Sequence, residues 1–242
     1  MLQAVFFDLD GTLADTAGDL VDPIQAMRAE RGLDPLPFEA LRPYASMGAR
    51  GLILRGFGVA RDDAAFAALR DEFLARYEQA MLVHTRLFEG MDTVLDALDD
   101  AGIRWGVISN KVERYVRPIV EGLGLGGRSV CAIGGDTTPF AKPHPEPLLH
   151  GARLASVEPT RCVYVGDDLR DIEAGRAAEM RTVAAAYGFC GVSGAPSEWG
   201  ADYLIEAPLE LLTELGIARG ESGMARATMA AASTPAGKVP KA

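Results

Sequence analysis

The amino-acid sequence predicts an α/β protein in which a mostly parallel sheet carries a helical insertion after its first strand. Short apolar runs alternate with segments of helical periodicity along most of the chain, which is typical of strand–helix–strand units. One stretch breaks this alternation, because residues 15–86 contain no convincing strand and are long enough to form a small domain. We therefore expect a parallel-sheet core and a separate helical part.

Four apolar runs have the character of parallel strands that are buried on both faces. They are residues 4–7, 105–108, 162–165 and 182–185, with weaker candidates at 129–133 and 203–205. Helical patterns lie between them at residues 91–101, 113–123, 145–154 and 171–179. In an open sheet of this kind, ligands bind beyond the carboxyl ends of the strands.

The insertion contains two apolar stripes with helical spacing. They are formed by Leu20, Ile24 and Met27 and by Phe66, Leu69, Phe73 and Tyr77. Residues 217–242 are rich in small and polar side chains without a sustained period, which predicts a disordered tail, although a helix at 225–232 stays open. We expect a core of residues 1–14 and 87–216, a helical domain of residues 15–86, and the tail.

Composition limits the environment and the partners of the chain. The formal net charge of −10 argues against a general attraction to nucleic acid or to an anionic membrane. The N-terminus lacks a basic segment, and no apolar run reaches the roughly 18 residues that a membrane span needs. Cys131, Cys162 and Cys190 lack metal-ligand spacing, so we expect reduced thiols in a cytoplasmic protein that is a monomer or a homodimer.

Two carboxylates follow the first predicted strand. Asp8 and Asp10 are two residues apart, so their side chains can point to the same side, and Gly11 permits a sharp turn. A carboxylate can attack phosphorus if a nearby Mg²⁺ screens its charge, and a second carboxyl can act as general acid and base. Thr12 can supply a hydroxyl or an N–H to phosphate. The alternative is a solvated turn, in which Asp and Gly are common.

Polar residues also follow the strand predicted at residues 105–108. Ser109 and Asn110 can donate to phosphate, although this pair is also ordinary in turns. Lysine is scarce before residue 217, where eighteen arginines accompany only Lys111 and Lys142. Because a compact ammonium and a planar guanidinium differ at a crowded phosphate, Lys142 is a candidate for charge stabilisation and Lys111 for substrate binding. Solvated surface lysines are the alternative.

A third acidic segment follows the strand predicted at residues 162–165. Asp167 and Asp171 are four apart and can face the same way if a helix begins there. Clustered carboxylates suit Mg²⁺, which prefers oxygen ligands and keeps several waters. Asp171 could instead cap its helix, and Asp168 could support the site or be solvated. We conclude that residues at four predicted strand ends form a site for a small phosphorylated metabolite.

These segments resemble the four motifs of the haloacid dehalogenase superfamily of phosphatases. The matching positions are residues 8–12, Ser109, Lys142 and residues 166–171, and the similarity extends from residue 4 to about 215. The resemblance implies a Rossmann-like parallel-sheet core with an inserted α-helical cap domain. It also implies an aspartyl-phosphate at Asp8 and acid–base catalysis by Asp10. Mg²⁺ would be held by Asp8, the backbone carbonyl of Asp10 and Asp167, with Asp171 in support.

Within the superfamily the chain is similar to phosphoglycolate phosphatases and, more closely, to N-acetylmuramic acid 6-phosphate phosphatases of cell-wall sugar recycling. Residues 84–90, 105–111, 167–173 and 199–202 carry this similarity. Residues 46–50 match that branch in part, so Arg50 is a candidate for binding a substrate carboxylate, with a solvated arginine as the alternative. Asp10 argues against a true dehalogenase, which needs no acid there. A sugar-phosphate mutase stays open, whereas a non-catalytic binding protein would be expected to lack one of the acids or the lysine.

Overall fold

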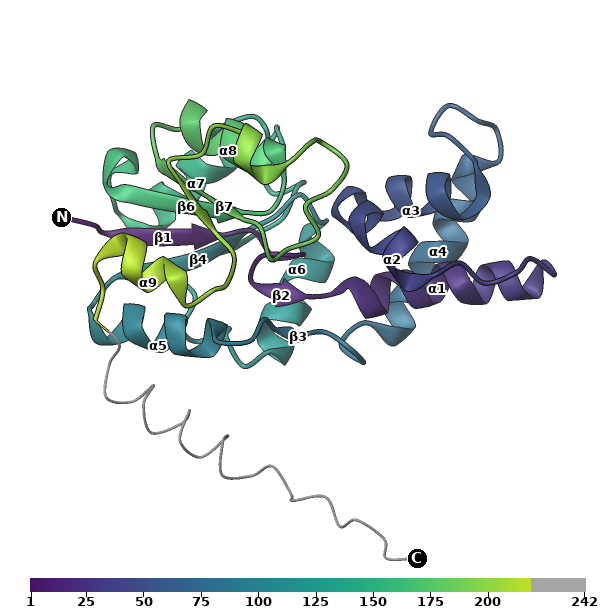
Figure 1. Ribbon diagram of the computed structural model, residues 1–242, viewed down its shortest axis with the longest axis horizontal. Helices are drawn as coiled ribbons and strands as arrows, with labels where there is room; N and C mark the ends of the chain where they lie inside the picture. Colours follow the sequence, from purple (N-terminus) through teal and green to yellow (C-terminus); the bar gives the residue numbers. More distant parts are fainter. Residues whose placement is uncertain (219–242) are drawn as a thin grey trace, which may run out of the picture.

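The computed structural model describes residues 1–218, which form a sheet-based core and a helical cap side by side along the long axis of the molecule (Figure 1). The core contains a six-stranded sheet with the order β5-β4-β1-β6-β7-β8. Every neighbouring pair in it is parallel. Its strands are β1 (Ala4–Phe7), β4 (Arg104–Ile108), β5 (Ala132–Ile133), β6 (Cys162–Gly166), β7 (Arg181–Ala185) and β8 (Tyr203–Ile205). The predicted α/β class is confirmed.

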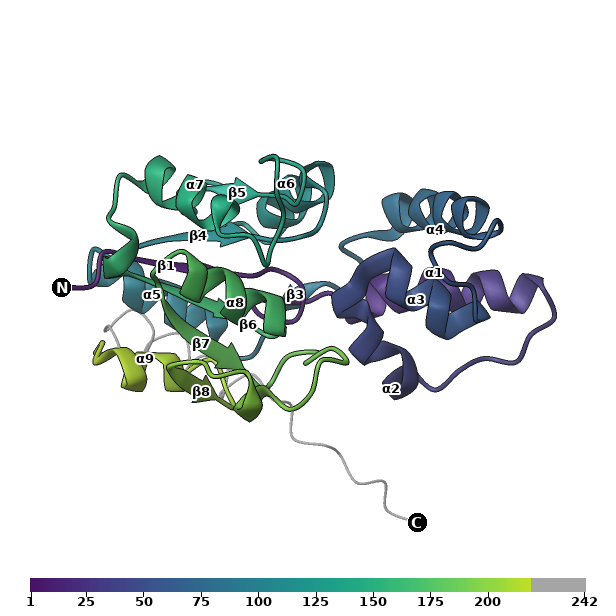
Figure 2. The same cartoon turned by 90° about the horizontal axis from the view of Figure 1, so that it is seen from above.

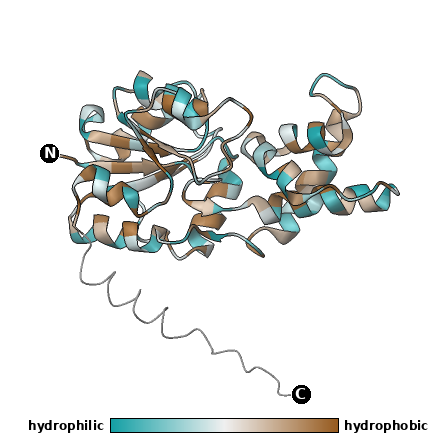
Figure 3. Cartoon of the chain, in the orientation of Figure 1, coloured by the Kyte–Doolittle hydropathy of each residue, from teal (hydrophilic) through white to brown (hydrophobic). Residues whose placement is uncertain are grey.

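Alternating side chains along the central strands pack into two hydrophobic layers, one on each face of the sheet. Val5 and Phe7 of β1 belong to the layer covered by α5 (Met91–Asp100), α6 (Glu113–Gly122) and α9 (Glu210–Leu215). Ala4 and Phe6 belong to the opposite layer, covered by α7 (Glu146–Ala155) and α8 (Leu169–Ala177). This double cover explains why the strands are continuous apolar runs, as Figure 3 shows.

The cap consists of four α-helices with a hydrophobic cluster of their own, separated from the core in the view of Figure 2. They are α1 (Ala17–Glu30), α2 (Phe38–Leu41), α3 (Gly48–Phe57) and α4 (Phe66–Ala80), with a 3₁₀ segment at Arg42–Met47. Both apolar stripes of the sequence lie in α1 and α4. Tyr115 of α6 and Phe189 also belong to this cluster, so the core contributes aromatic side chains to the packing of the cap.

Two short strands join the cap to the core. β2 (Ala14–Asp15) pairs antiparallel with β3 (Arg86–Leu87), so the chain leaves and re-enters the core at neighbouring points. We expected no strand in residues 15–86, but this range includes Asp15 of β2 and Arg86 of β3. The domain boundaries assigned from sequence, between 14 and 15 and between 86 and 87, fall within this pair and stay a prediction.

The C-terminal part of the described chain packs on the core. Ile217 contacts the layer that contains α9, and its N–H donates to the Leu212 carbonyl at 2.8 Å. Apart from Ile217 and Ala218, the predicted disordered tail of residues 217–242 and the open helix at 225–232 lie outside the described residues. No helix among residues 1–218 has both the length and the apolar character to cross a membrane.

Candidate active site

Most of the predicted site residues gather near the carboxyl ends of β1, β4 and β6, beside a cavity of about 540 Å³. The core and the cap both line this cavity. Asp8, Asp10, Ser109, Lys142 and Asp171 belong to the core part of the wall. The cap part is largely apolar, with aromatic side chains from α4 and the exposed Arg50 from α3. Such a shape suits a ligand that is bound between the two parts.

The turn after β1 brings this strand into contact with the acidic turn after β6. Gly11 has φ +89°, a left-handed conformation that favours glycine. A Cβ there would lie 2.2 Å from Asp167 Oδ2, so the turn also needs a residue without a side chain. The Thr12 hydroxyl donates to Asp167 Oδ1 at 2.8 Å. The turn thus fixes the Asp167 carboxylate as well as presenting Asp8.

Asp10 is held from two directions. Its carboxylate accepts hydrogen bonds from the Thr16 hydroxyl at 2.6 Å and from Lys111 Nζ at 2.9 and 3.0 Å. Lys111 Nζ also lies 4.8 Å from the centre of the Tyr77 ring of the cap. Burial alone would lower the pKa of Lys111, but the Asp10 carboxylate and Tyr77 outweigh it and raise that pKa. Lys111 therefore stays charged and links Asp10 to the cap.

Lys142 is almost completely buried among carboxylates. Its Nζ lies 3.0 Å from Asp8 Oδ1 and 2.7 Å from Asp171 Oδ1, and it donates to the Tyr164 hydroxyl at 2.8 Å. Burial acts to lower the pKa of Lys142, whereas Asp171 and Asp8 raise it and determine the direction of the shift. The ammonium is therefore retained at the centre of the site.

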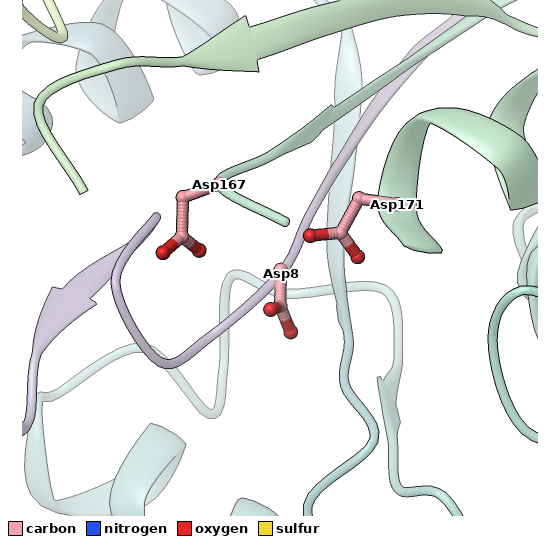
Figure 4. Close-up of side chains that lie close together, drawn as sticks. All are labelled: Asp8, Asp167 and Asp171. Carbon is pink, nitrogen blue, oxygen red and sulfur yellow. The ribbon is translucent and has the colours of Figure 1, made fainter. Parts of the chain in front are cut away.

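Asp8, Asp167 and Asp171 form a cluster of buried carboxylates (Figure 4). One oxygen of each lies within 4.8 Å of the other two. Burial and the charges of Asp8 and Asp171 raise the pKa of Asp167 well above its usual range. Burial likewise raises the pKa of Asp171 to about 7, although Lys142 opposes the shift. Burial is the main cause of both shifts, and the crowding of three carboxylates around one ammonium adds to it.

This charge imbalance fits a divalent cation. Three ionised carboxylates and Lys142 leave a formal charge of −2, which a bound Mg²⁺ would neutralise. Asp8 Oδ1 is buried and accepts no hydrogen bond from residues 1–218. It forms an ion pair with the ammonium of Lys142. Oxygen donors of this kind are the ligands that Mg²⁺ prefers. The donor set therefore suits the predicted metal.

The helix α8 positions Asp171 through its N-terminus. Asp168 caps the helix by accepting from the Arg170 N–H at 3.0 Å, and Asp171 Oδ2 accepts from the Asp168 N–H at 3.1 Å. Asp171 thus takes part in the cap as well as in the carboxylate cluster. Arg170 forms two hydrogen bonds to the Asp168 carboxylate, at 2.7 and 2.9 Å, and also donates to the Ser46 carbonyl of the cap.

The residues predicted to contact the phosphate or the substrate differ in how the structure uses their side chains. Ser109 is buried and lines the cavity, with its hydroxyl 3.3 Å from the Lys111 N–H. The Asn110 carboxamide donates to the Lys142 carbonyl and accepts from the Lys142 N–H, so it fixes the loop that carries Lys142. Thr12 is fully buried, and since its hydroxyl binds Asp167 it is not available to phosphate. Contacts of Asn110, Lys111 and the Thr12 N–H with substrate stay predictions.

Sequence reasoning missed several residues at the site. Tyr164 binds Lys142 from within β6, and its hydroxyl group in an otherwise apolar run was an available signal. Thr16 lies six residues after Asp10, beyond the matched motif. Arg170 stood inside the motif at residues 166–171 but received no role. Arg61 lines the cavity from the loop between α3 and α4, and no pattern in the sequence indicated it.

Three comparisons relate this chain to known proteins. A family model described as haloacid dehalogenase-like hydrolase matches residues 5–185. An N-acetylmuramic acid 6-phosphate phosphatase of Pseudomonas putida is 44% identical over 210 residues, which cover 87% of this chain and 94% of the relative. A phosphoglycolate phosphatase of Xanthomonas campestris pv. campestris is 45% identical over 209 residues, which cover 86% and 94%.

A solved structure supports the fold. The crystal structure of a predicted phosphoglycolate phosphatase from Haemophilus somnus superposes with a TM-score of 0.78 and covers 88% of this chain and 98% of that chain. Its sequence is 24% identical, so the likeness concerns the arrangement of core and cap.

Proposed function

Because this chain belongs to the haloacid dehalogenase-like hydrolase family and is a phosphatase, we propose that it is a Mg²⁺-dependent phosphomonoester hydrolase that uses Asp8 as its nucleophile. The observation that carries this proposal is the cluster of Asp8, Asp167 and Asp171 around Lys142. Asp8, Asp171 and Lys142 line the cavity, and Asp10 lies in the same wall. This arrangement supplies a nucleophile, an acid–base group and the charges that a phosphoryl group needs.

In the first step a carboxylate oxygen of Asp8 attacks phosphorus, and the bond between phosphorus and the leaving oxygen breaks. The carboxyl group of Asp10 gives its proton to that oxygen, so the dephosphorylated alcohol leaves and Asp8 carries the phosphoryl group. In the second step Asp10 takes a proton from water as the water oxygen attacks phosphorus. The bond to Asp8 then breaks, which releases phosphate and restores the carboxylate.

Lys142 and Ser109 act on the phosphoryl oxygens. The ammonium of Lys142 orients Asp8 and offers positive charge next to it, while the Ser109 hydroxyl is a neutral donor at the end of β4. Asp8, the backbone carbonyl of Asp10 and Asp167 would hold Mg²⁺, with Asp171 in support. When bound, Mg²⁺ screens the repulsion between the carboxylate and the phosphate and draws charge from the phosphoryl oxygens.

The best candidate substrate is N-acetylmuramic acid 6-phosphate, and the alternative is 2-phosphoglycolate. Relatives of both names match most of the chain at similar identity. The cavity of about 540 Å³ favours the larger molecule, because a two-carbon acid leaves most of that volume empty. Both substrates carry a carboxylate, for which Arg50 is the predicted partner. In this reading the enzyme works in the cytoplasm, in the recycling of cell-wall sugars.

Replacement of the nucleophile tests the mechanism. We expect Asp8→Asn to abolish Mg²⁺-dependent hydrolysis of p-nitrophenyl phosphate, a loss of at least roughly 10³-fold, because an amide cannot take the phosphoryl group. Asp100→Asn is the matched control, since Asp100 is exposed at the end of α5 and does not line the cavity. Circular dichroism checks that both variants fold. Turnover retained by Asp8→Asn would remove Asp8 as the nucleophile.

A second experiment tests the substrate. We expect a higher kcat/KM for N-acetylmuramic acid 6-phosphate than for 2-phosphoglycolate when both are assayed with Mg²⁺, because specificity is the ratio of these values. The opposite order would make phosphoglycolate phosphatase the better description. Comparable low values for both, with efficient turnover of the aryl phosphate, would mean that the substrate is a different phosphomonoester.

A further inference from the structure

The cap places its charged residues unevenly around the cavity. Residues 15–86 contain eleven acidic residues and nine arginines, so the cap as a whole is nearly neutral. The part of the cavity wall that comes from the cap nevertheless includes three arginines, Arg50, Arg61 and Arg70, and no acidic residue. The cap part of the wall is therefore largely apolar, but the charge that it carries is positive.

Pairing with carboxylates separates these arginines from the other basic residues of the wall. Six basic side chains line the cavity, and four of them pair with an acid: Lys111 with Asp10, Lys142 with Asp8 and Asp171, Arg170 with Asp168, and Arg70 with Asp71. The two others, Arg50 and Arg61, form no hydrogen bond or ion pair with any residue in the range 1–218. Both are exposed, so their guanidinium groups are free to bind a ligand.

Arg50 and Arg61 belong to a different part of the molecule from the proposed catalytic residues. Arg50 lies in the first turn of α3, and Arg61 lies in the loop between α3 and α4, so both belong to the cap. Asp8, Asp10 and Lys142 belong to the core end of the same cavity. The remaining cap wall includes the apolar side chains of Phe66, Phe73 and Leu74, which offer nothing that binds an anion.

We propose that Arg61 is a specificity-determining residue that, together with Arg50, binds a second anionic group on the substrate, away from the phosphate. The substrate class is then a phosphomonoester whose organic part carries a carboxylate. A guanidinium matches a carboxylate with two parallel hydrogen bonds, and the exposed Arg61 side chain has no competing partner among residues 1–218. This proposal rests on the proposed phosphatase function.

A pair of substrates that differ only in the carboxylate provides the test. N-acetylmuramic acid 6-phosphate is N-acetylglucosamine 6-phosphate with a lactyl ether on one hydroxyl. The ratio of their kcat/KM values therefore measures how much the lactyl group, which carries the carboxylate, contributes to specificity. For Arg61→Ala we expect kcat/KM for the first substrate to fall about 10- to 100-fold, mostly through KM, and kcat/KM for the second to change less than about twofold. Arg61→Lys should recover part of the loss, because it keeps the charge without the planar fork.

Arg55→Ala is the control, because Arg55 is also an arginine of the cap but does not line the cavity. It should leave the ratio unchanged. The double variant of Arg50 and Arg61, both replaced by alanine, should lose less than the product of the two single losses if both guanidinium groups bind one carboxylate. Wild-type enzyme that does not prefer the acidic substrate, or an equal loss on both substrates in Arg61→Ala, would overturn the proposal.

A binding measurement separates this proposal from the catalytic one. Calorimetric titration of the same two compounds into Asp8→Asn, with and without Arg61→Ala, reports the carboxylate contact without turnover. A preference for the acidic compound that disappears with Arg61→Ala supports the proposal even if wild-type hydrolysis fails, in which case the proposed function is what is wrong. Equal binding of the two compounds would refute the role of Arg61.

Discussion

At the scale of single residues, some positions of the site accept only a side chain of one size and shape. Lys142 Nζ has two carboxylates, the Tyr164 hydroxyl and the Ile108 carbonyl within 3.1 Å. A guanidinium is larger and needs donors spread in a plane, so it cannot occupy the same point among these groups. This explains in physical terms why a lysine is found here in a chain that otherwise uses arginine.

Gly11 offers a test of close approach at the same scale. We expect Gly11→Ala to lower the free energy of unfolding and to abolish Mg²⁺-dependent hydrolysis, because the new Cβ would displace the Asp167 carboxylate. Its φ of +89° adds backbone strain of about 1–2 kcal/mol. Urea denaturation and the p-nitrophenyl phosphate assay measure the two effects.

Gly102→Ala is the control for that prediction. Gly102 has φ +66°, but a Cβ there would meet no atom within 4 Å. This variant should therefore show only the backbone strain and keep its activity. Equal activity of the two variants would mean that the contact between Gly11 and Asp167 does not matter for catalysis.

At the scale of elements, the N-terminus of α8 couples helix stability to the site. We expect Asp168→Ala to lower the free energy of unfolding by about 1–2 kcal/mol, since it removes the capping oxygen. Activity should fall as well, because the same turn carries Asp171. Asp168→Ser keeps a capping oxygen but loses the paired hydrogen bonds to Arg170, and it should be the more stable of the two variants. Equal loss in both would assign the effect to Arg170 instead.

The predictability of each element followed its surroundings. The strands β1, β4, β6 and β7 are buried on both faces, so each is an apolar run that the sequence reveals within one residue at either end. For residues 129–133 the run was longer than the strand, since only Ala132 and Ile133 pair with β4. β2 and β3 have two residues each, and the sequence of the entire cap lies between them. Local periodicity cannot predict such a pair.

At the scale of the whole molecule, some site residues could be predicted from the sequence and others could not. Residues that follow strands were predictable, because a parallel sheet brings all its carboxyl ends to one edge, and Asp8, Ser109 and Asp167 lie where this rule places them. Arg61 was not predictable, because its place on the cavity depends on how the cap folds over the core. The same holds for Tyr77, which belongs to an ordinary apolar stripe until its ring meets Lys111.

We expect the buried carboxylates to make the stability of the whole molecule depend on pH and Mg²⁺ as well. Burial raises the pKa of Asp171 to about 7, whereas an aspartate in an unfolded chain has a pKa of about 3.9. Between these values the folded, metal-free protein binds more protons than the unfolded chain. The contribution of Asp171 to the free energy of unfolding therefore falls as pH rises from about 4 to about 7.

Mg²⁺ binding should show the opposite trend, because it requires the ionised cluster and competes with the proton. We expect the affinity for Mg²⁺ to be about 100-fold weaker at pH 5 than at pH 8, and the rise in Tm caused by Mg²⁺ to be correspondingly smaller at pH 5. Differential scanning calorimetry over a range of Mg²⁺ concentrations at both pH values measures this. Asp171→Asn should reduce the difference between the two pH values without removing it, since it eliminates one of the two carboxyl groups whose pKa is raised and leaves Asp167. An affinity that is the same at both pH values in the wild-type protein would show that Asp167 and Asp171 are both already ionised at pH 5.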